Sequence, residues 1–219
     1  MIIERPAPKI TCLLNGPLYL LNDTTPIPVP NLCRANGEPC AIVQRAALCR
    51  CGGSQNKPFC DGTHGAIGFT DQRIDDDTRN HRVSYIGKHI TIHDNRGICA
   101  HVGFCTGHLK KVFHAGQKPW IDSDGASVEE IITTINKCPS GALSYSIDDV
   151  EYKDQNRGPL VKVINNGPYA ITGGIELVGV TFSEGASKEH YTLCRCGASK
   201  NKPFCDGSHW RLGFRDSLR

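Results

Sequence analysis

The sequence has few aromatic residues, a single methionine and no long apolar run. Phe, Trp and Tyr make up 7% of the 219 residues, and hydrophobic residues together make up 39%. The uncharged stretch at residues 10–22 is interrupted by Asn15, Gly16 and Pro17, whereas a helix that spans a bilayer needs about 20 apolar residues. These shortages argue against a transmembrane helix and against one large hydrophobic core. With 23 Gly and 13 Pro, they predict a loop-rich chain.

Charge and the first residues exclude further classes. Lys and Arg (25) barely exceed Asp and Glu (22), which gives a formal net charge of +3 with no basic run. The electrostatic footprint of a nucleic-acid-binding protein is therefore missing. Glu4 and Pro6 stand where a secretory signal peptide needs a basic start and an unbroken apolar stretch. We expect a cytoplasmic protein with no nucleic-acid or membrane partner, in which disulfides are disfavoured.

Cysteine, by contrast, is abundant, with twelve residues beside nine histidines. Much of it lies in a repeat. Residues 48–69 read LCRCGGSQNKPFCDGTHGAIGF and residues 193–214 read LCRCGASKNKPFCDGSHWRLGF, with sixteen of the 22 positions identical. An N-G-P turn precedes each copy, at Asn15 and at Asn166, and is followed by residues that suit short strands. A unit of about 55–65 residues therefore occurs twice.

Each copy spaces three cysteines and one histidine in a way that suits metal binding. Cys49 and Cys51 are separated by one residue, so both can bind one metal atom. Cys60 and His64 lie on the same side of a first helical turn if Asp61 begins a helix. The second copy repeats the set as Cys194, Cys196, Cys205 and His209. Zinc and sulfide-bridged iron both accept these donors, but C-x-C is tighter than the usual spacing of structural zinc ligands, which favours iron–sulfur clusters.

The pattern C-R-C-G-x-S-x-N-K-P-F-C-D-G-[TS]-H resembles the motif of the CDGSH iron–sulfur domain, the mitoNEET family. Both copies match it at every ligand position. The resemblance implies a 2Fe-2S cluster with Cys49 and Cys51 on the inner iron and Cys60 and His64 on the outer iron, and likewise in the second copy. It also implies small β-rich units with one short helix that pair about a twofold axis. Two copies in one chain would then form an internal pseudo-dimer within a monomer.

A different group of cysteines lies between the copies. In bacterial ferredoxins C-x-x-C-x-x-C is followed far downstream by C-P, and Cys99, Cys105 and Cys138-Pro139 follow this order with Val102 at the middle ligand position. Residues 95–147 resemble the divergent single-cluster ferredoxins. Three thiolates suit a 3Fe-4S cluster, whose missing corner needs no ligand.

The middle site leaves alternatives open. A 4Fe-4S cluster would take water, His101 or His108 at its fourth iron, although each of these histidines, like His114, is by itself more typical of a surface or packing residue. Buried structural thiols are the alternative for the three cysteines. Three cysteines remain outside all sites and are expected to be free thiols: Cys12, Cys33 and Cys40.

Local patterns predict several elements. Residues 127–136 form the clearest helix, because Ser127 and Glu130 make a capping box and apolar residues recur at helical spacing up to Pro139. Residues 83–93 alternate as one or two strands do, and the charged residues 70–82 are typical of a solvated linker.

The sequence therefore predicts an α+β protein with three parts: a CDGSH unit over residues 1–70, a ferredoxin-like domain over residues 71–152 and a second CDGSH unit over residues 153–219. We expect two 2Fe-2S clusters and one 3Fe-4S or 4Fe-4S cluster, and no enzymatic activity. One-electron transfer between redox partner proteins is the leading function. Cluster delivery to apo-acceptors, or redox or pH sensing through the histidine-bound iron, is the alternative. There are two simpler possibilities. The clusters could serve only to stabilise a fold with a small core, or the protein could be a zinc-stabilised interaction module.

Overall fold

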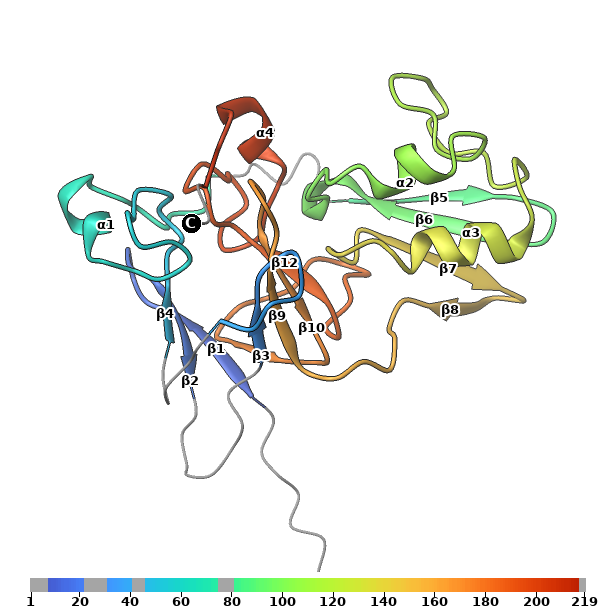
Figure 1. The fold of residues 1–219 in the computed structure, drawn as a ribbon. Coiled ribbons are helices and arrows are strands. Elements are labelled where there is room, and N and C mark those ends of the chain that lie inside the picture. The colour runs from blue at the N-terminus through green and yellow to red at the C-terminus, as the bar shows by residue number, and fades with distance from the viewer. Residues whose placement is uncertain (1–7, 22–30, 41–45, 75–80, 217–219) are drawn as a thin grey trace, which may run out of the picture.

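The computed structural model describes residues 8–21, 31–40, 46–74 and 81–216. Its helices are short and its strands form small sheets, so the fold is of the α+β class (Figure 1). Of the linker predicted at residues 70–82, residues 75–80 lie outside the described part, residues 70–74 and 81 are described without a helix or strand, and Arg82 is already the first residue of a strand. No helix in the described ranges has the length and hydropathy needed to cross a bilayer.

Two four-stranded sheets are built from the two copies of the repeat. The first has the order β11-β1-β2-β4, with β1 (Lys9–Cys12), β2 (Leu18–Leu21), β4 (Ala46–Leu48) and β11 (Glu176–Val178). The second has the order β12-β10-β9-β3, with β3 (Asn31–Cys33), β9 (Leu160–Val163), β10 (Tyr169–Thr172) and β12 (Tyr191–Leu193). Strands β2 and β10 directly follow the two N-G-P turns, as the sequence predicts.

Each of these sheets takes one strand from the other copy. Strand β11 pairs in parallel with β1, where Ile10 faces Leu177, and β3 pairs in parallel with β9, where Leu32 faces Val161. All four side chains are buried in one hydrophobic core that the two sheets share. Neither copy completes its sheet without the other.

The third sheet lies wholly between residues 82 and 152, inside the predicted middle domain. It is antiparallel in the order β5-β6-β7-β8, with β5 (Arg82–Ile86), β6 (Thr91–Asn95), β7 (Leu143–Ile147) and β8 (Val150–Tyr152). The short helices η1 (Arg96–Ile98) and α2 (Phe104–His108) follow β6. Residues 83–93 thus contribute two strands. The predicted domain boundaries stay a prediction.

Helix α3 (Val128–Ile135) confirms the predicted capping box. The Ser127 hydroxyl accepts from the Glu130 amide at 3.2 Å, and the Glu130 carboxylate accepts from the Ser127 amide at 3.1 Å. Two amides that would otherwise lack partners are satisfied in this way. Ile131 and Ile135 are buried in a second core that belongs to the middle sheet. The middle domain therefore has a hydrophobic core separate from the one that the two repeat sheets share.

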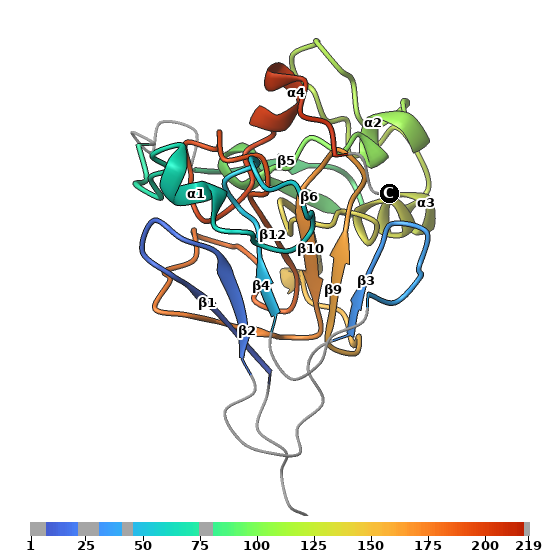
Figure 2. The same cartoon turned by 60° about the vertical axis from the view of Figure 1, so that its left-hand side comes forward.

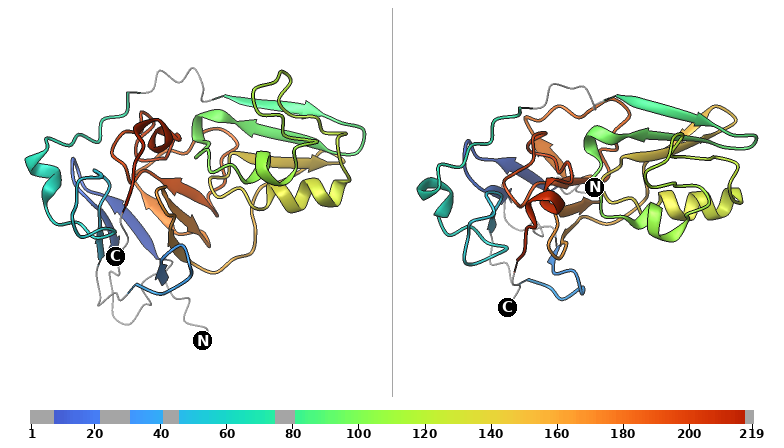
Figure 3. Two further views of the ribbon diagram at one scale, coloured as in Figure 1. Left: turned by 45° about the horizontal axis from the view of Figure 1, so that its top comes forward. Right: turned by 90° about the horizontal axis from the view of Figure 1, so that it is seen from above.

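The copies of the repeat end in matching one-turn helices, α1 (Thr63–Ala66) and α4 (Ser208–Leu212). Each follows a glycine in the left-handed region, Gly62 at φ 88° and Gly207 at φ 81°. Helix α1 therefore begins two residues after Asp61, which does not cap it as predicted; its carboxylate instead accepts from the amides of Gln55 and Thr63 at 2.8 and 3.0 Å. In all views α4 lies between α1 and α2 (Figures 1–3).

Candidate metal centres

The donor atoms of each repeat lie in close pairs. In the N-terminal copy the Cys49 and Cys51 sulfurs are 3.6 Å apart, and the Cys60 sulfur is 3.3 Å from His64 Nδ1. In the C-terminal copy the corresponding distances are 3.9 Å for Cys194 and Cys196, and 3.4 Å for Cys205 and His209. The structure thus brings together both predicted pairs in each copy.

These distances can be compared with those around a tetrahedral metal. Two thiolates bound at about 2.3 Å to one metal atom lie about 3.8 Å apart, and a thiolate and an imidazole nitrogen lie about 3.5 Å apart. All four pairs are close to these values. Among the described residues, no three or more His, Cys, Asp or Glu side chains converge as a single ion would require. Each donor pair therefore has the spacing that binding to one shared metal atom would require.

An arginine between the two cysteines of each C-x-C motif anchors the turn. Arg50 Nε donates to the Gly16 carbonyl at 2.6 Å, and Arg195 Nε donates to the Gly167 carbonyl at 2.9 Å. Both arginines are buried, at 3% and 1% exposure. Because a guanidinium offers five donors in a fixed plane, each holds its metal-binding turn against the N-G-P turn of the same copy.

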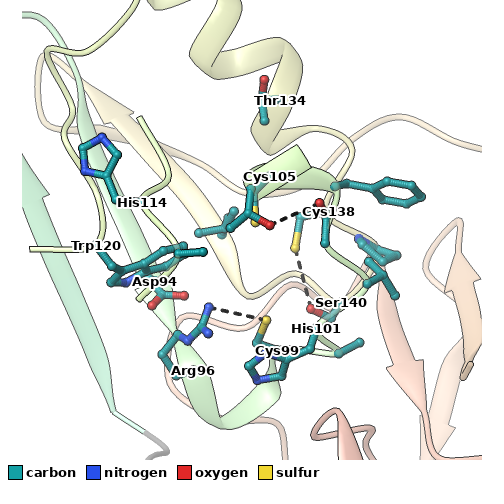
Figure 4. A pocket seen from close by; sticks show the side chains of 18 of the residues that line it. Asp94, Arg96, Cys99, His101, Cys105, His114, Trp120, Thr134, Cys138 and Ser140 are labelled. Carbon is teal, nitrogen blue, oxygen red and sulfur yellow. Dashed lines mark hydrogen bonds between the residues drawn. The ribbon is translucent and has the colours of Figure 1, made fainter. Parts of the chain in front are cut away.

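The three middle cysteines line one cavity of about 300 Å³ (Figure 4). Cys99 follows η1, Cys105 lies in α2 and Cys138 follows α3, so three separate segments supply the thiols. The volume greatly exceeds the roughly 10–15 Å³ that one water needs. Burial raises the pKa of Cys99 to about 12 and also raises that of Cys105. As free thiols both would stay neutral, whereas a bound metal deprotonates its thiol ligands outright.

Of the two histidines considered as a fourth ligand, only one reaches the cavity. His101 lines the cavity. His108 does not line it, and its Nδ1 lies 3.0 Å from the Phe104 carbonyl. His114 also lines the cavity, with Nε2 2.9 Å from the Lys111 carbonyl. Arg96 contacts the Cys99 sulfur at 3.7 Å and lies over the Trp120 ring at 4.5 Å, which places a positive charge beside the cavity.

Comparison with known proteins agrees with this arrangement. A family model described as "Iron-binding zinc finger CDGSH type" matches residues 15–65 and 166–210, and one described as "Divergent 4Fe-4S mono-cluster" matches residues 85–148. The chain belongs to the CDGSH-type iron-binding proteins, with a divergent mono-cluster domain between its two CDGSH regions. It is thus an iron–sulfur-binding protein.

Two curated relatives share 41% identity with the chain over 61 residues, which is 28% of this chain and 80% of each relative. Both are called "Uncharacterized protein YjdI", one from Escherichia coli strain K12 and the other from Escherichia coli O157:H7. No solved structure matches the chain significantly.

The two CDGSH sites share their donors but differ in exposure. In the C-terminal site all four donor residues are buried, including Cys205 at 2% and His209 at 4% exposure. In the N-terminal site only Cys49 is buried, while Cys60 and His64 are partly exposed. Burial lowers the pKa of His209. Solvent therefore reaches the outer donor pair of one CDGSH site and is kept from that of the other.

Tyr169 supports the N-terminal CDGSH site from the other copy of the repeat. Its fully buried hydroxyl lies 2.6 Å from the Cys49 carbonyl and 3.0 Å from the Pro58 carbonyl. We expect Tyr169→Phe to cost about 1–2 kcal/mol, because the buried Cys49 carbonyl loses its hydroxyl donor, and to speed loss of the N-terminal centre in urea. Tyr191→Phe is the matched control, since its hydroxyl donates to the Ile175 carbonyl, away from the ligand turns. Equal loss from both CDGSH sites in Tyr169→Phe would contradict this role.

Asp94 lies at the middle cavity with an unusual environment. It is 1% exposed, and neither carboxylate oxygen has a hydrogen-bond partner within the described residues. Burial raises its pKa to about 7, against the lowering effect of Arg96. Because the unfolded chain ionises near pH 3.9, the folded state is penalised increasingly as pH rises from about 4 to 7.

Asp94→Asn should remove this penalty. We expect the variant to be more stable than the parent by about 1–3 kcal/mol at pH 8, with the gain shrinking toward pH 4. The measurement is anaerobic urea unfolding at several pH values, with Asp148→Asn as a control at an exposed turn. A gain that did not vary with pH would contradict this account, because it could not come from the ionisation of Asp94.

Sequence reasoning missed the residues that hold the donors in place. The sequence does carry a signal for the two arginines, Arg50 and Arg195, because the same residue stands between two cysteine ligands in both copies. The signal for Tyr169 is weaker, because the residue at the same position after the first N-G-P turn is Leu18 and the tyrosine is therefore not repeated. All twelve cysteines lie in the described residues, and none of them forms a disulfide bond.

Proposed function

We propose that the protein transfers single electrons through three iron–sulfur centres. The N-terminal 2Fe-2S centre would be held by Cys49, Cys51, Cys60 and His64, the C-terminal one by Cys194, Cys196, Cys205 and His209, and the middle centre by Cys99, Cys105 and Cys138. When bound, such clusters accept or release one electron at a time. The partners would be redox proteins, and the chain itself would catalyse no reaction on a small-molecule substrate.

The observation that carries this proposal is the pairing of the donors. Each CDGSH site offers two donor pairs at 3.3–3.9 Å, and each pair can hold one of two bridged irons. A single structural zinc would instead need all four donors around one point. The exchange of β3 and β11 between the sheets supports an internal pseudo-dimer as the frame for both sites.

The chain's own residues set how these centres respond. A neutral histidine in place of a fourth thiolate removes one negative charge, which raises the reduction potential of a 2Fe-2S centre. The buried guanidiniums of Arg50 and Arg195 keep the C-x-C turns fixed against carbonyl groups. The ligand turns are therefore held in place before an electron arrives.

For the middle centre we propose three irons. Three cysteines line the cavity, and a 3Fe-4S cluster needs no fourth donor. Four irons, as the description of the matching family has it, would need water or His101 at the fourth position. Electron paramagnetic resonance of the oxidised, anaerobically purified protein distinguishes the two, because only the three-iron form is paramagnetic in that state.

A spectropotentiometric titration tests electron transfer directly. We expect all three centres to be reduced and reoxidised reversibly within a physiological range of potentials. Centres that could not be reduced reversibly in that range would contradict the proposal.

The exposure of Cys60 and His64 favours cluster delivery as a second candidate. An acceptor could reach these donors without the protein unfolding. Holo-protein mixed with an apo-ferredoxin would then colour the acceptor at the expense of the N-terminal centre. If no colour is transferred, electron transfer stands alone.

A further inference from the structure

Within the described residues, the loop that carries Cys99 and His101 packs on the C-terminal CDGSH motif. An added Cβ at Gly207, within the C-terminal C-D-G-S-H motif, would lie 2.4 Å from Cδ2 of His101. The imidazole of His101 therefore packs directly on the backbone between the donors Cys205 and His209. The same histidine lines the middle cavity two residues after Cys99.

A second contact fixes the same two loops. The Asn201 side-chain amide donates to the Gly97 carbonyl at 2.9 Å, and Asn201 is 1% exposed. Gly97 lies in η1, just before Cys99. A buried hydrogen bond of this kind resists separation of the loops, because breaking it leaves polar groups without water.

The N-terminal copy has no such contact. Gly62, the counterpart of Gly207, has no described atom within 4 Å of an added Cβ, and Asn56, the counterpart of Asn201, is exposed. The two CDGSH sites instead meet each other through a backbone bridge between Cys51 and Cys196. The C-terminal site thus has neighbours on both sides, which agrees with the place of α4 between α1 and α2 (Figure 3).

We propose that His101 is a positioning residue that couples the middle centre to the C-terminal CDGSH centre and closes the latter to external partners. This inference rests on the proposed electron-transfer function. When an electron passes between the two centres, the donor centre is oxidised by one electron and the acceptor centre is reduced by one electron. No bond is made or broken, and no proton is transferred. The exposed N-terminal site is then the CDGSH site that outside proteins meet.

Gly207→Ala and Gly62→Ala form a matched pair for the test. Both glycines have φ between 80° and 90°, so alanine strains the two backbones alike, but only Gly207→Ala pushes on His101. His101→Asn is the second variant, because asparagine tolerates the positive φ of 53° at this position. All variants are examined as the full, cluster-loaded chain reduced with dithionite.

The readout is the magnetic coupling between the middle and C-terminal centres in pulsed electron paramagnetic resonance. We expect this coupling to be weakened in Gly207→Ala and His101→Asn and unchanged in Gly62→Ala. Unchanged coupling in both of the first two variants would overturn the proposal. A converted middle-centre signal with intact coupling in His101→Asn would also overturn it, because His101 would then be a ligand. Dithionite makes the coupling measurable even if the potentials lie outside the physiological range, so a failure of the proposed function is recognised separately in the titration.

Discussion

On acidification the N-terminal CDGSH centre is expected to disappear before the C-terminal one, so that visible absorbance falls in two steps of similar size. Protons compete with iron for the imidazole nitrogen. Burial lowers the pKa of His209, so its nitrogen binds protons only at lower pH. The side chain of His64 is only partly buried, so solvent and its protons reach the outer donor pair of the N-terminal site directly.

The variants His64→Cys and His209→Cys assign the two steps. His64→Cys should remove the first step and lower the potential of the N-terminal centre, because a thiolate adds a negative charge, while the C-terminal centre stays nearly unchanged. His209→Cys should affect only the second step. Equal changes at both sites in either variant would show that the two centres do not respond independently.

Replacing Arg195 with methionine is expected to destabilise the protein by about 3–5 kcal/mol, because it leaves the carboxylate of Asp216 buried without its partner. Both side chains of this ion pair are fully buried. The variant also removes the donors to the carbonyls of Ile164 and Gly167, which hold the C-x-C turn. Anaerobic urea unfolding measures the loss of stability.

Arg50→Met is the matched control for this change. Arg50 makes the equivalent ion pair with Asp71 at 2.7 Å, but the side chain of Asp71 is 19% exposed. Water can therefore solvate the remaining carboxylate, and we expect a smaller loss than for Arg195→Met. A larger loss for Arg50→Met would contradict the difference in burial between the two sites.

Much of the local structure could be predicted from the sequence because its causes are local. The repeat predicted two equivalent sites, and the capping box of Ser127 and Glu130 predicted the start of α3. The spacing of Cys60 and His64 brought their donors together even though the helix begins later than expected. At Asp61 the prediction was wrong, because the left-handed Gly62 occupies the N-cap position, while the Asp61 carboxylate accepts from the loop amide of Gln55 and from the amide of Thr63, the first helical residue.

The relations between distant segments could not be predicted in this way. The exchange of β3 and β11 follows from a core shared by two sheets, and no periodicity within one strand encodes its partner. The same holds for Tyr169, which reaches across to Cys49, and for His101, which packs on Gly207. The two sites share one motif but differ in burial, and in the described residues the loop that carries His101 packs on the C-terminal one.

Iron and acid-labile sulfide in protein purified without oxygen test the central claim most directly. Two binuclear centres and one three-iron centre predict seven irons and eight sulfides per chain, or eight of each with four irons in the middle, as the cluster formulae require. A colourless protein with stoichiometric zinc and no acid-labile sulfide would contradict the account.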